Sequence, residues 1–123
     1  MKVLALDYGS ARTGVAVSDP TGELARPLGV VEQAASQSGL ERLAAIVAEE
    51  EAERVVVGLP LTLKGEHGEQ AKETEQFVAT LRARLEVPVE LFDERFTSVL
   101  ADGDDARAAA HLLSDYLDWS REL

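Results

Sequence analysis

The sequence has no cysteine among its 123 residues, and only 5% of its residues are aromatic. The absence of cysteine excludes disulfides, thiolate zinc sites and a cysteine nucleophile. No stretch approaches the roughly 20 apolar residues of a membrane-spanning helix. Only a short apolar run precedes Asp7, whereas a secretory signal needs roughly 7–15 apolar residues. We therefore expect a cytoplasmic protein with no membrane contact and an aliphatic core.

Basic residues are scarce as well: 12 Lys and Arg stand against 23 Asp and Glu, which gives a formal net charge of −11. This balance opposes a general nucleic-acid-binding surface, because contacts to phosphate need Lys and Arg. Part of the excess lies in one acidic run, residues 49–53, which is typical of a solvated helix end. Carboxylates are also the side chains that a site for a hard metal ion requires.

The chain is long enough for one core and too short for two, so we expect a single domain over residues 1–123. Three strands within residues 3–6, 14–18 and 24–31 are separated by turn signals and indicate an antiparallel meander. Pro27 and Gly29 make the third an edge or bulged strand. Later strands, at 54–60 and 88–92, alternate with helices, which predicts parallel pairing. The expected fold is α/β, a mixed five-stranded sheet with helices on both faces.

Apolar spacing predicts three helices. Ser38 and Glu41 match a capping box at the start of the first. The second carries an apolar stripe between residues 71 and 85. The last spans residues 105–117, with a core-facing stripe at Ala106, Ala109, Ala110, Leu113 and Leu117.

Acidic residues stand where the first and fifth strands end and where the last helix begins. They are Asp7, the pair Asp93 and Glu94, and Asp105 beside Asp104. Sites in open α/β sheets form outside the carboxyl ends of the strands. Carboxylates that converge there need a cation between them, and oxygen ligands select Mg²⁺ or Mn²⁺. Alternatively, each acid is a turn former, or an N-cap in the case of Asp104 or Asp105.

Four sequence blocks occur in a fixed order along nearly the whole chain. They are D-x-G-x4-G-x-A-x-S-D at residues 7–19, G-L-P at 58–60, D-E-R-F-T-S at 93–98, and D-x3-A-A-x-L-L-x2-Y-L at 105–117. Together they resemble the YqgF/RuvX family of Holliday-junction-resolvase-like proteins, which are also described as pre-16S rRNA nucleases. A lone D-x-G would be weak evidence, whereas the ordered set is specific.

The resemblance implies a ribonuclease H-like fold and metal-dependent cleavage of phosphodiester bonds. It places the catalytic and metal-binding acids at Asp7, Glu94 and Asp105, with Mg²⁺ or Mn²⁺ as the cofactor. The substrate would be contacted from nearby positions. The candidates are Gly9, Thr62, Arg95, Thr97 and Ser98.

Several of these positions have a structural alternative. Arg95 would then neutralise its acidic neighbours, and Thr97 would cap a helix. Thr62 stands where the family usually has asparagine. In addition, only residues 99–104 separate Ser98 from Asp105, where the family usually has a longer and often basic segment. This shortening bears on substrate binding more than on metal binding.

The histidines and the tryptophan have structural interpretations. His67 and His111 are not at metal-ligand spacing, and His111 is expected on the outer face of the last helix. Trp119 is expected to pack over the end of that helix, with an interface role as the alternative.

The leading hypothesis is an endonuclease acting on nucleic acid, either structured RNA or branched DNA. We favour processing of the 5′ end of pre-16S ribosomal RNA over resolution of a Holliday junction. A resolvase should be a homodimer with two-fold symmetry, because it cuts two strands symmetrically. Two further hypotheses are a nucleotide-binding, ATPase-like fragment and a non-catalytic binding domain on the same fold. The first normally requires two domains and a second glycine-rich phosphate loop, and the sequence has neither.

Overall fold

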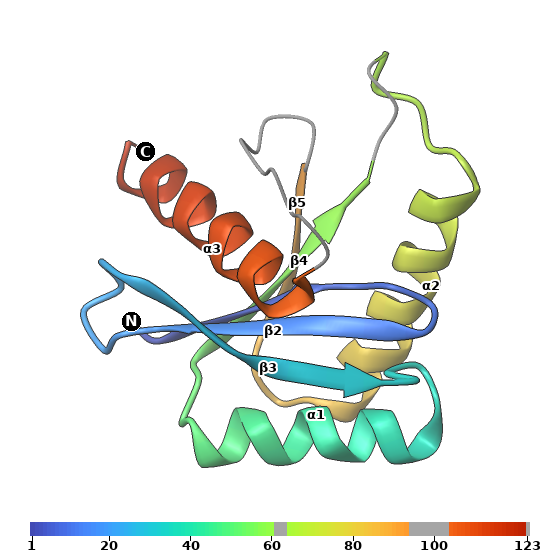
Figure 1. The fold of residues 1–123 in the computed structure, drawn as a ribbon, viewed down its shortest axis with the longest axis horizontal. Helices are drawn as coiled ribbons and strands as arrows, with labels where there is room; N and C mark the ends of the chain where they lie inside the picture. Colours follow the sequence, from blue (N-terminus) through green and yellow to red (C-terminus); the bar gives the residue numbers. More distant parts are fainter. Residues whose placement is uncertain (61–63, 94–103, 123) are drawn as a thin grey trace.

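The computed structural model describes residues 1–60, 64–93 and 104–122, and its elements follow the predicted order (Figure 1). No helix in the described ranges combines the length and apolarity needed to cross a bilayer. The elements are β1 (Val3–Asp7), β2 (Arg12–Ser18), β3 (Ala25–Glu32), α1 (Gln37–Glu49), β4 (Arg54–Leu59), α2 (Glu69–Arg84), β5 (Val89–Asp93) and α3 (Asp105–Arg121).

The strands form one five-stranded sheet in the order β3-β2-β1-β4-β5. The predicted meander is confirmed, because β1 pairs antiparallel with β2, and β2 with β3. The predicted parallel half is confirmed too: β4 runs parallel to β1, and β5 parallel to β4. The register shifts opposite Val15 and Ala16, where β3 contains Pro27 and Gly29. The edge strand is therefore bulged, as those two residues led us to expect.

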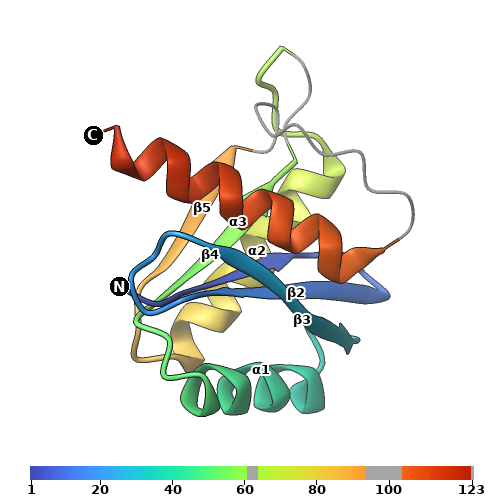
Figure 2. The ribbon, with the colours of Figure 1, turned by 60° about the vertical axis from the view of Figure 1, so that its left-hand side comes forward.

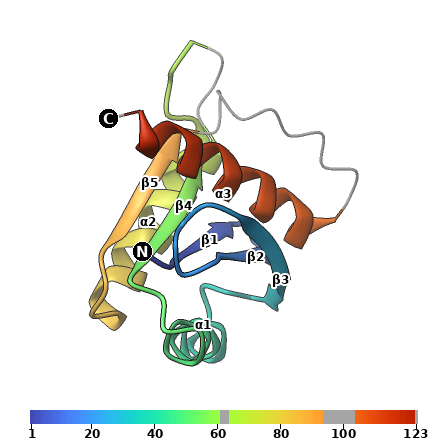
Figure 3. The same cartoon turned by 90° about the vertical axis from the view of Figure 1, so that its left-hand side faces the viewer.

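Helices cover both faces of the sheet: α1 and α2 lie on one side and α3 on the other (Figures 2 and 3). Side chains alternate between these layers along each strand. In β1, Leu4 and Leu6 pack in the layer of α1 and α2, whereas Val3 and Ala5 pack against α3. Residues 55–57 of β4 are divided in the same way and have no exposed surface. This two-sided burial explains why the β4 segment is a continuous apolar run.

The start of α1 differs from the predicted capping box at Ser38. The helix begins at Gln37, and Ser36 is its N-cap, with Oγ accepting a hydrogen bond from Gly39 N at 3.1 Å. A Cβ on Gly39 would lie 2.1 Å from the carbonyl oxygen of Gln33. The entering chain therefore crosses the first turn too closely for any residue larger than glycine. The spacing of residues in the sequence does not show this close approach. The observed N-cap, Ser36, therefore lies two residues before the predicted one.

The buried stripe of α3 is also displaced from the prediction. Ala109, Leu113 and Leu117 are buried as expected, but Ala106 and Ala110 are only half-buried. The remaining buried positions are Ala108, Leu112 and Tyr116. Leu112 and Tyr116 offer more apolar area to the sheet than the two alanines, so the helix is turned to bury them. His111 is exposed, as predicted.

Replacing the observed cap should be more costly than replacing the predicted one. We expect Ser36→Ala to lower the free energy of unfolding by about 1 kcal/mol, because Gly39 N loses its acceptor. Ser38→Ala removes only the contact between the two serine hydroxyls at 3.2 Å and leaves the backbone cap in place, so it should change the free energy of unfolding by less than about 0.5 kcal/mol. Urea denaturation of both variants measures the difference, and equal losses would contradict the cap assignment.

Candidate active site

Asp7 ends β1 at the edge of the sheet where its parallel neighbours also end. Leu6 is level with Val57 of β4, and β4 continues in register with β5 to the pair Leu59 and Asp93. Because side chains alternate along a strand, Asp7 follows Val3 and Ala5 onto the α3 side of the sheet. The side chain is half-buried. Asp7 therefore lies at the carboxyl edge, on the face that α3 covers.

Gly14 brings the start of α3 next to Asp7. Gly14 is the antiparallel partner of Asp7 in β2. A Cβ on Gly14 would lie 1.8 Å from the carbonyl oxygen of Asp105 and 2.3 Å from its carbonyl carbon. Only a residue without a side chain allows the helix to approach this closely. The contact joins Asp7 and Asp105, which are far apart in the sequence, through one intervening residue.

Asp104 and Asp105 have different roles at the start of α3. Asp104 is the N-cap, and its Oδ1 accepts a hydrogen bond from Arg107 N at 3.0 Å. Asp105 follows as the first helical residue, with Oδ2 3.1 Å from Nε of Arg12. The alternative that Asp105 is merely the cap is therefore wrong, because its neighbour performs that function. The carboxylate of Asp105 points instead to Arg12 at the start of β2.

Arg12 is a site residue that the sequence analysis missed. It begins β2, and its side chain remains 59% exposed while it pairs with Asp105. Its position within the glycine-bearing block, between Gly9 and Gly14, was the available signal. The guanidinium supplies positive charge beside Asp105, and more than half of the Arg12 side chain is exposed to solvent.

The loop after Asp7 is held tightly on both sides. A Cβ on Gly9 would lie 2.5 Å from the carbonyl oxygen of Arg12, so this glycine accommodates a close approach within the loop itself. Tyr8 points to the opposite face of the sheet and stacks on Phe77 of α2, with ring centroids 4.3 Å apart. Burial raises the pKa of Tyr8, and the carboxylate of Glu73 raises it further. The residue after Asp7 is therefore anchored to α2 by ring stacking.

The remaining predicted site residues stand at or beyond the ends of the described segments. Asp93 is the last residue of β5 and belongs to the same edge as Asp7. Five of the predicted positions lie outside the described residues: Thr62, Glu94, Arg95, Thr97 and Ser98. Two of the three predicted metal ligands, Asp7 and Asp105, are therefore placed by the structure, and it brings them together.

No group of three His, Asp or Glu side chains able to hold a metal ion occurs within residues 1–60, 64–93 and 104–122. His67 pairs with Glu75, with 2.9 Å between Nδ1 and Oε1, on the surface beside α2. Asp7 and Asp105 do offer carboxylate oxygens, the donors that Mg²⁺ and Mn²⁺ prefer. The described part of the site therefore fits such an ion in the chemistry of its donor atoms.

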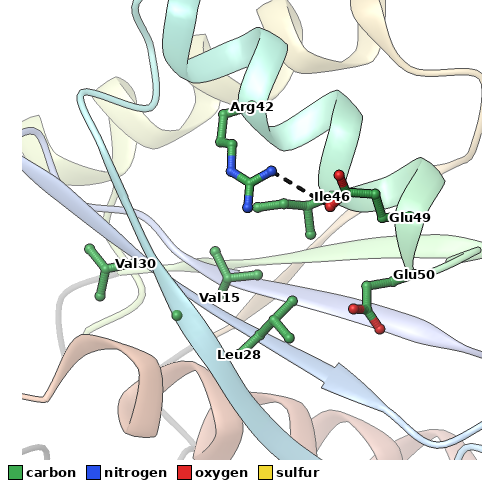
Figure 4. Close-up of a pocket in the computed structure, with 8 residues that line it drawn as sticks. Val15, Leu28, Val30, Arg42, Ile46, Glu49 and Glu50 are labelled. Atoms are coloured by element: carbon green, nitrogen blue, oxygen red, sulfur yellow. Dashed lines mark ion pairs between the residues drawn. The ribbon is translucent and has the colours of Figure 1, made fainter.

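A separate pocket of about 200 Å³ opens between β3 and α1, on the other face of the sheet from α3 (Figure 4). Its floor is apolar, formed by Val15, Leu28 and Ile46 among others. The charges on its rim are already matched: Arg42 lies 3.6 Å from Glu49, and Glu50 pairs with lysine and arginine side chains. Nothing in this pocket combines unmatched charge with reactive groups, so the carboxyl edge at Asp7 remains the candidate active site.

The model of the RuvX family, described as Holliday junction resolvase, matches residues 1–119. The chain belongs to the RuvX family. A curated relative from Chloroflexus aggregans, named "Putative pre-16S rRNA nuclease", is 42% identical over 134 residues, covering 97% of this chain and 94% of its own length. That alignment spans 134 positions, more than the 123 residues of the chain, so the relative has residues with no counterpart here. Membership identifies this RuvX chain as a nuclease.

Solved structures confirm the ribonuclease H-like fold of this RuvX protein. Thermus thermophilus RuvC, in complex with a Holliday junction substrate, superposes with a TM-score of 0.61 at 16% identity, covering 99% of this chain and 96% of its own. The Holliday junction resolvase of fowlpox virus gives a TM-score of 0.57 at 11% identity, with 97% and 99% covered. At sequence identities this low, the similarity to these two structures concerns the fold alone.

The contact between Gly14 and Asp105 can be tested by adding one methyl group. Gly14→Ala should displace the start of α3, lower stability by about 1–3 kcal/mol and reduce cleavage, because overpacking forces the backbone to move. The matched control is Gly29→Ala in β3, where a Cβ meets nothing within 4 Å. It should alter stability by less than about 0.5 kcal/mol. Thermal melts and a cleavage assay measure both, and a fully active Gly14→Ala variant would contradict the geometry.

Proposed function

We propose that this RuvX protein is a metal-dependent endonuclease whose centre consists of Asp7, Glu94 and Asp105. The observation that carries the proposal is the contact at Gly14, which holds Asp7 and Asp105 at one point of the carboxyl edge. Carboxylates gathered at one edge repel each other unless a cation lies between them. Natural sequences keep such costly groupings chiefly at functional sites. Glu94 follows the last residue of β5 directly and is proposed as the third ligand.

The three carboxylates would hold Mg²⁺ or Mn²⁺, which activates water and stabilises the leaving oxygen when it is bound. The chain's own residues orient the reactants. Asp105 is fixed by Arg12 and by the first turn of α3, and Asp7 by the sheet. The exposed guanidinium of Arg12 lies beside these acids and is proposed to bind a non-bridging phosphate oxygen.

The proposed substrate is structured RNA, and specifically the 5′ region of pre-16S ribosomal RNA. The support is the name of the Chloroflexus relative, which shares 42% of its residues over nearly the full length. Branched DNA is the second candidate, supported by the family description and by the junction bound to RuvC in the structural neighbour. The proposed contacts outside the described residues are Thr62, Arg95, Thr97 and Ser98, with Gly9 beside Asp7.

Neutralising Asp7 tests the catalytic proposal. Asp7→Asn should keep the fold and most nucleic-acid affinity but abolish cleavage, because one metal ligand loses its charge. Mg²⁺ or Mn²⁺ should raise the melting temperature of the parent more than that of the variant, since a ligand of the folded state stabilises it. Glu41→Gln, on the exposed face of α1, removes the same charge far from the edge and should leave both properties unchanged.

The assay should include single-stranded RNA, structured precursor RNA and a four-way DNA junction. Cleavage of precursor RNA by a monomer supports the RNA proposal. Symmetric cleavage of the junction by a dimer would favour the resolvase instead. Wild-type rates in purified Asp7→Asn would refute the catalytic centre for every substrate.

The scarcity of basic residues leads to a prediction on salt. With 12 Lys and Arg in the chain, few phosphates can be neutralised, so the slope of log affinity against log salt should be shallow. We expect a slope shallower than about −4, corresponding to roughly four phosphate contacts. Filter binding with catalytically inactive Asp7→Asn between low and moderate salt gives the value. A slope near −10 would show that the surface concentrates its positive charge far more than the composition implies.

A further inference from the structure

A pocket of about 260 Å³ lies on the α2 side of the sheet, beside the residue that follows Asp7. We call it the Tyr8 pocket. It is lined by Tyr8, Ala35, Glu73, Gln76, Phe77 and Thr80. All six residues belong to the described ranges. The proposed cleavage chemistry uses none of these side chains, so their grouping beside Asp7 calls for an explanation of its own.

One face of α2 forms a wall of the Tyr8 pocket. Four lining residues recur at three- and four-residue intervals, which places them side by side on the helix: Glu73, Gln76, Phe77 and Thr80. Phe77 is buried in the core, whereas the other three are exposed. Tyr8 reaches this face from the loop after β1 and stacks on Phe77, with the ring planes 16° apart. The pocket therefore exists only once the sheet and α2 have packed together.

The Tyr8 pocket provides a fixed ring on which a flat group can stack. Phe77 is only 3% exposed and holds the half-buried ring of Tyr8 in place. The volume is below the roughly 300 Å³ at which pockets for drug-sized ligands begin, so it suits one small planar group. Unpaired bases stack on aromatic side chains in this way in proteins that bind single-stranded nucleic acid.

The polar groups of the pocket select among the bases. Among the described residues, none forms an ion pair or hydrogen bond with the carboxylate of Glu73, the side-chain amide of Gln76 or the hydroxyl of Tyr8. Burial raises the pKa of Tyr8 and Glu73 raises it further, so the hydroxyl stays protonated and can donate. The pocket therefore offers two carboxylate oxygens as acceptors, together with donors from an amide and a phenol.

Guanine matches this set of groups best. Its Watson–Crick edge presents N1–H and the N2 amino group as neighbouring donors, which the two oxygens of one carboxylate can accept, and O6 beside them as an acceptor. Adenine, cytosine and uracil each place an acceptor next to their donor, so Glu73 would meet only one donor from them. A phosphate would be repelled by Glu73, and no lysine or arginine lines the pocket to hold it.

The Tyr8 pocket begins one residue from the proposed metal ligand. Asp7 and Tyr8 are consecutive, so their Cα atoms are about 3.8 Å apart, while their side chains point to opposite faces of the sheet. A strand whose phosphate lies at Asp7 can pass over the carboxyl edge and turn a neighbouring base towards α2. Only an unpaired base makes this turn readily, because a paired base must first leave its stack.

We propose that the Tyr8 pocket binds an unpaired guanine base of the substrate strand, next to the phosphodiester bond that is cut. The base stacks on Tyr8, its N1–H and N2 amino group donate to Glu73, and its O6 accepts from Gln76. Tyr8 and Glu73 thus select the cleavage site. This selection rests on the proposed nuclease function, whereas binding of the base itself does not.

Base analogues test the hydrogen bonds one at a time. The probe is a dye-labelled single-stranded RNA of uridines with one central guanosine, added to the full chain with EDTA and followed by anisotropy. Inosine at the centre lacks the N2 amino group and should weaken binding about fivefold, and adenosine about tenfold. The matched control is 7-deazaguanosine, which keeps the Watson–Crick edge and should bind as guanosine does. Equal affinity for all four RNAs would overturn the proposal.

Two matched variants test the carboxylate. Glu73→Gln should reduce the preference for guanosine over adenosine to less than about twofold, because one acceptor oxygen is lost. Glu69→Gln removes the same charge one turn earlier in α2, outside the pocket, and should keep the preference. Thermal melts confirm that both variants are folded. Retention of the full preference in Glu73→Gln would overturn the role of the carboxylate.

The ring is tested against a substrate that has no base to stack. Tyr8→Leu should weaken binding of the guanosine RNA about tenfold, because stacking is lost. It should leave an RNA with an abasic central residue nearly unaffected, since that RNA does not fill the pocket. Equal losses with both RNAs would show that Tyr8 only anchors the loop after Asp7, and would overturn its role in stacking.

Mapping of the cleaved bonds separates this proposal from the nuclease proposal. The parent should cut precursor RNA beside unpaired guanosines, and Glu73→Gln should cut at more varied sequences. Cut sites unrelated to guanosine, made by an enzyme that Asp7→Asn inactivates, would overturn the pocket and leave the nuclease centre standing. A guanosine preference in binding, together with undiminished cleavage by Asp7→Asn, would do the reverse. Saturable binding of free guanosine monophosphate at micromolar concentration would make the pocket a site for a free nucleotide and overturn the proposal.

Discussion

The first turn of α3 rests directly on β2, and the geometry of the site depends on this contact. Gly14 leaves no side chain between the two backbones, so the carbonyl of Asp105 occupies the space that a Cβ would fill. The rest of α3 follows from that starting point, because its buried stripe must then meet Val3, Ala5 and Val56 of the sheet. Asp7 becomes a neighbour of the helix start for the same reason. The packing of α3 and the geometry of the site therefore both depend on the contact at Gly14.

Electrostatics complements this steric constraint. Asp7 and Asp105 come from different elements and meet through Gly14 at the carboxyl edge, and Arg12 lies beside Asp105. Part of the remaining acidic excess lies away from this edge, around the end of α1. The net charge of −11 is therefore not spread evenly over the surface. In the proposed mechanism, Arg12 and a bound metal ion would supply at this edge the positive charge that the surface as a whole lacks.

The aromatic side chains that the structure describes form two groups, one on each face of the sheet. Tyr8 and Phe77 stack on the α2 side and anchor the loop after Asp7. On the α3 side, Phe92, Tyr116 and Trp119 form the second group and extend to the surface. The core between them is almost wholly Val, Leu, Ile and Ala, as composition predicted. Trp119 packs over the end of α3 as expected, yet it retains enough open surface to serve as an interface.

Periodicity and motif order in the sequence determined the element order, the mixed sheet, the nuclease family and the candidate acids, because these depend on local patterns. Only the tertiary structure decided which residues of α3 face the sheet and that Arg12 belongs to the site. It also showed that Ser36 is the N-cap of α1, and that Asp104 rather than Asp105 is the N-cap of α3. The orientation of α3 and the place of Arg12 depend on contacts between segments remote in the chain. The two caps are local contacts, but they depend on how the chain enters each helix, which the spacing of residue types does not show. A spacing rule records positions along one segment, whereas the clearance above Gly14 or Gly39 exists only once two segments have packed.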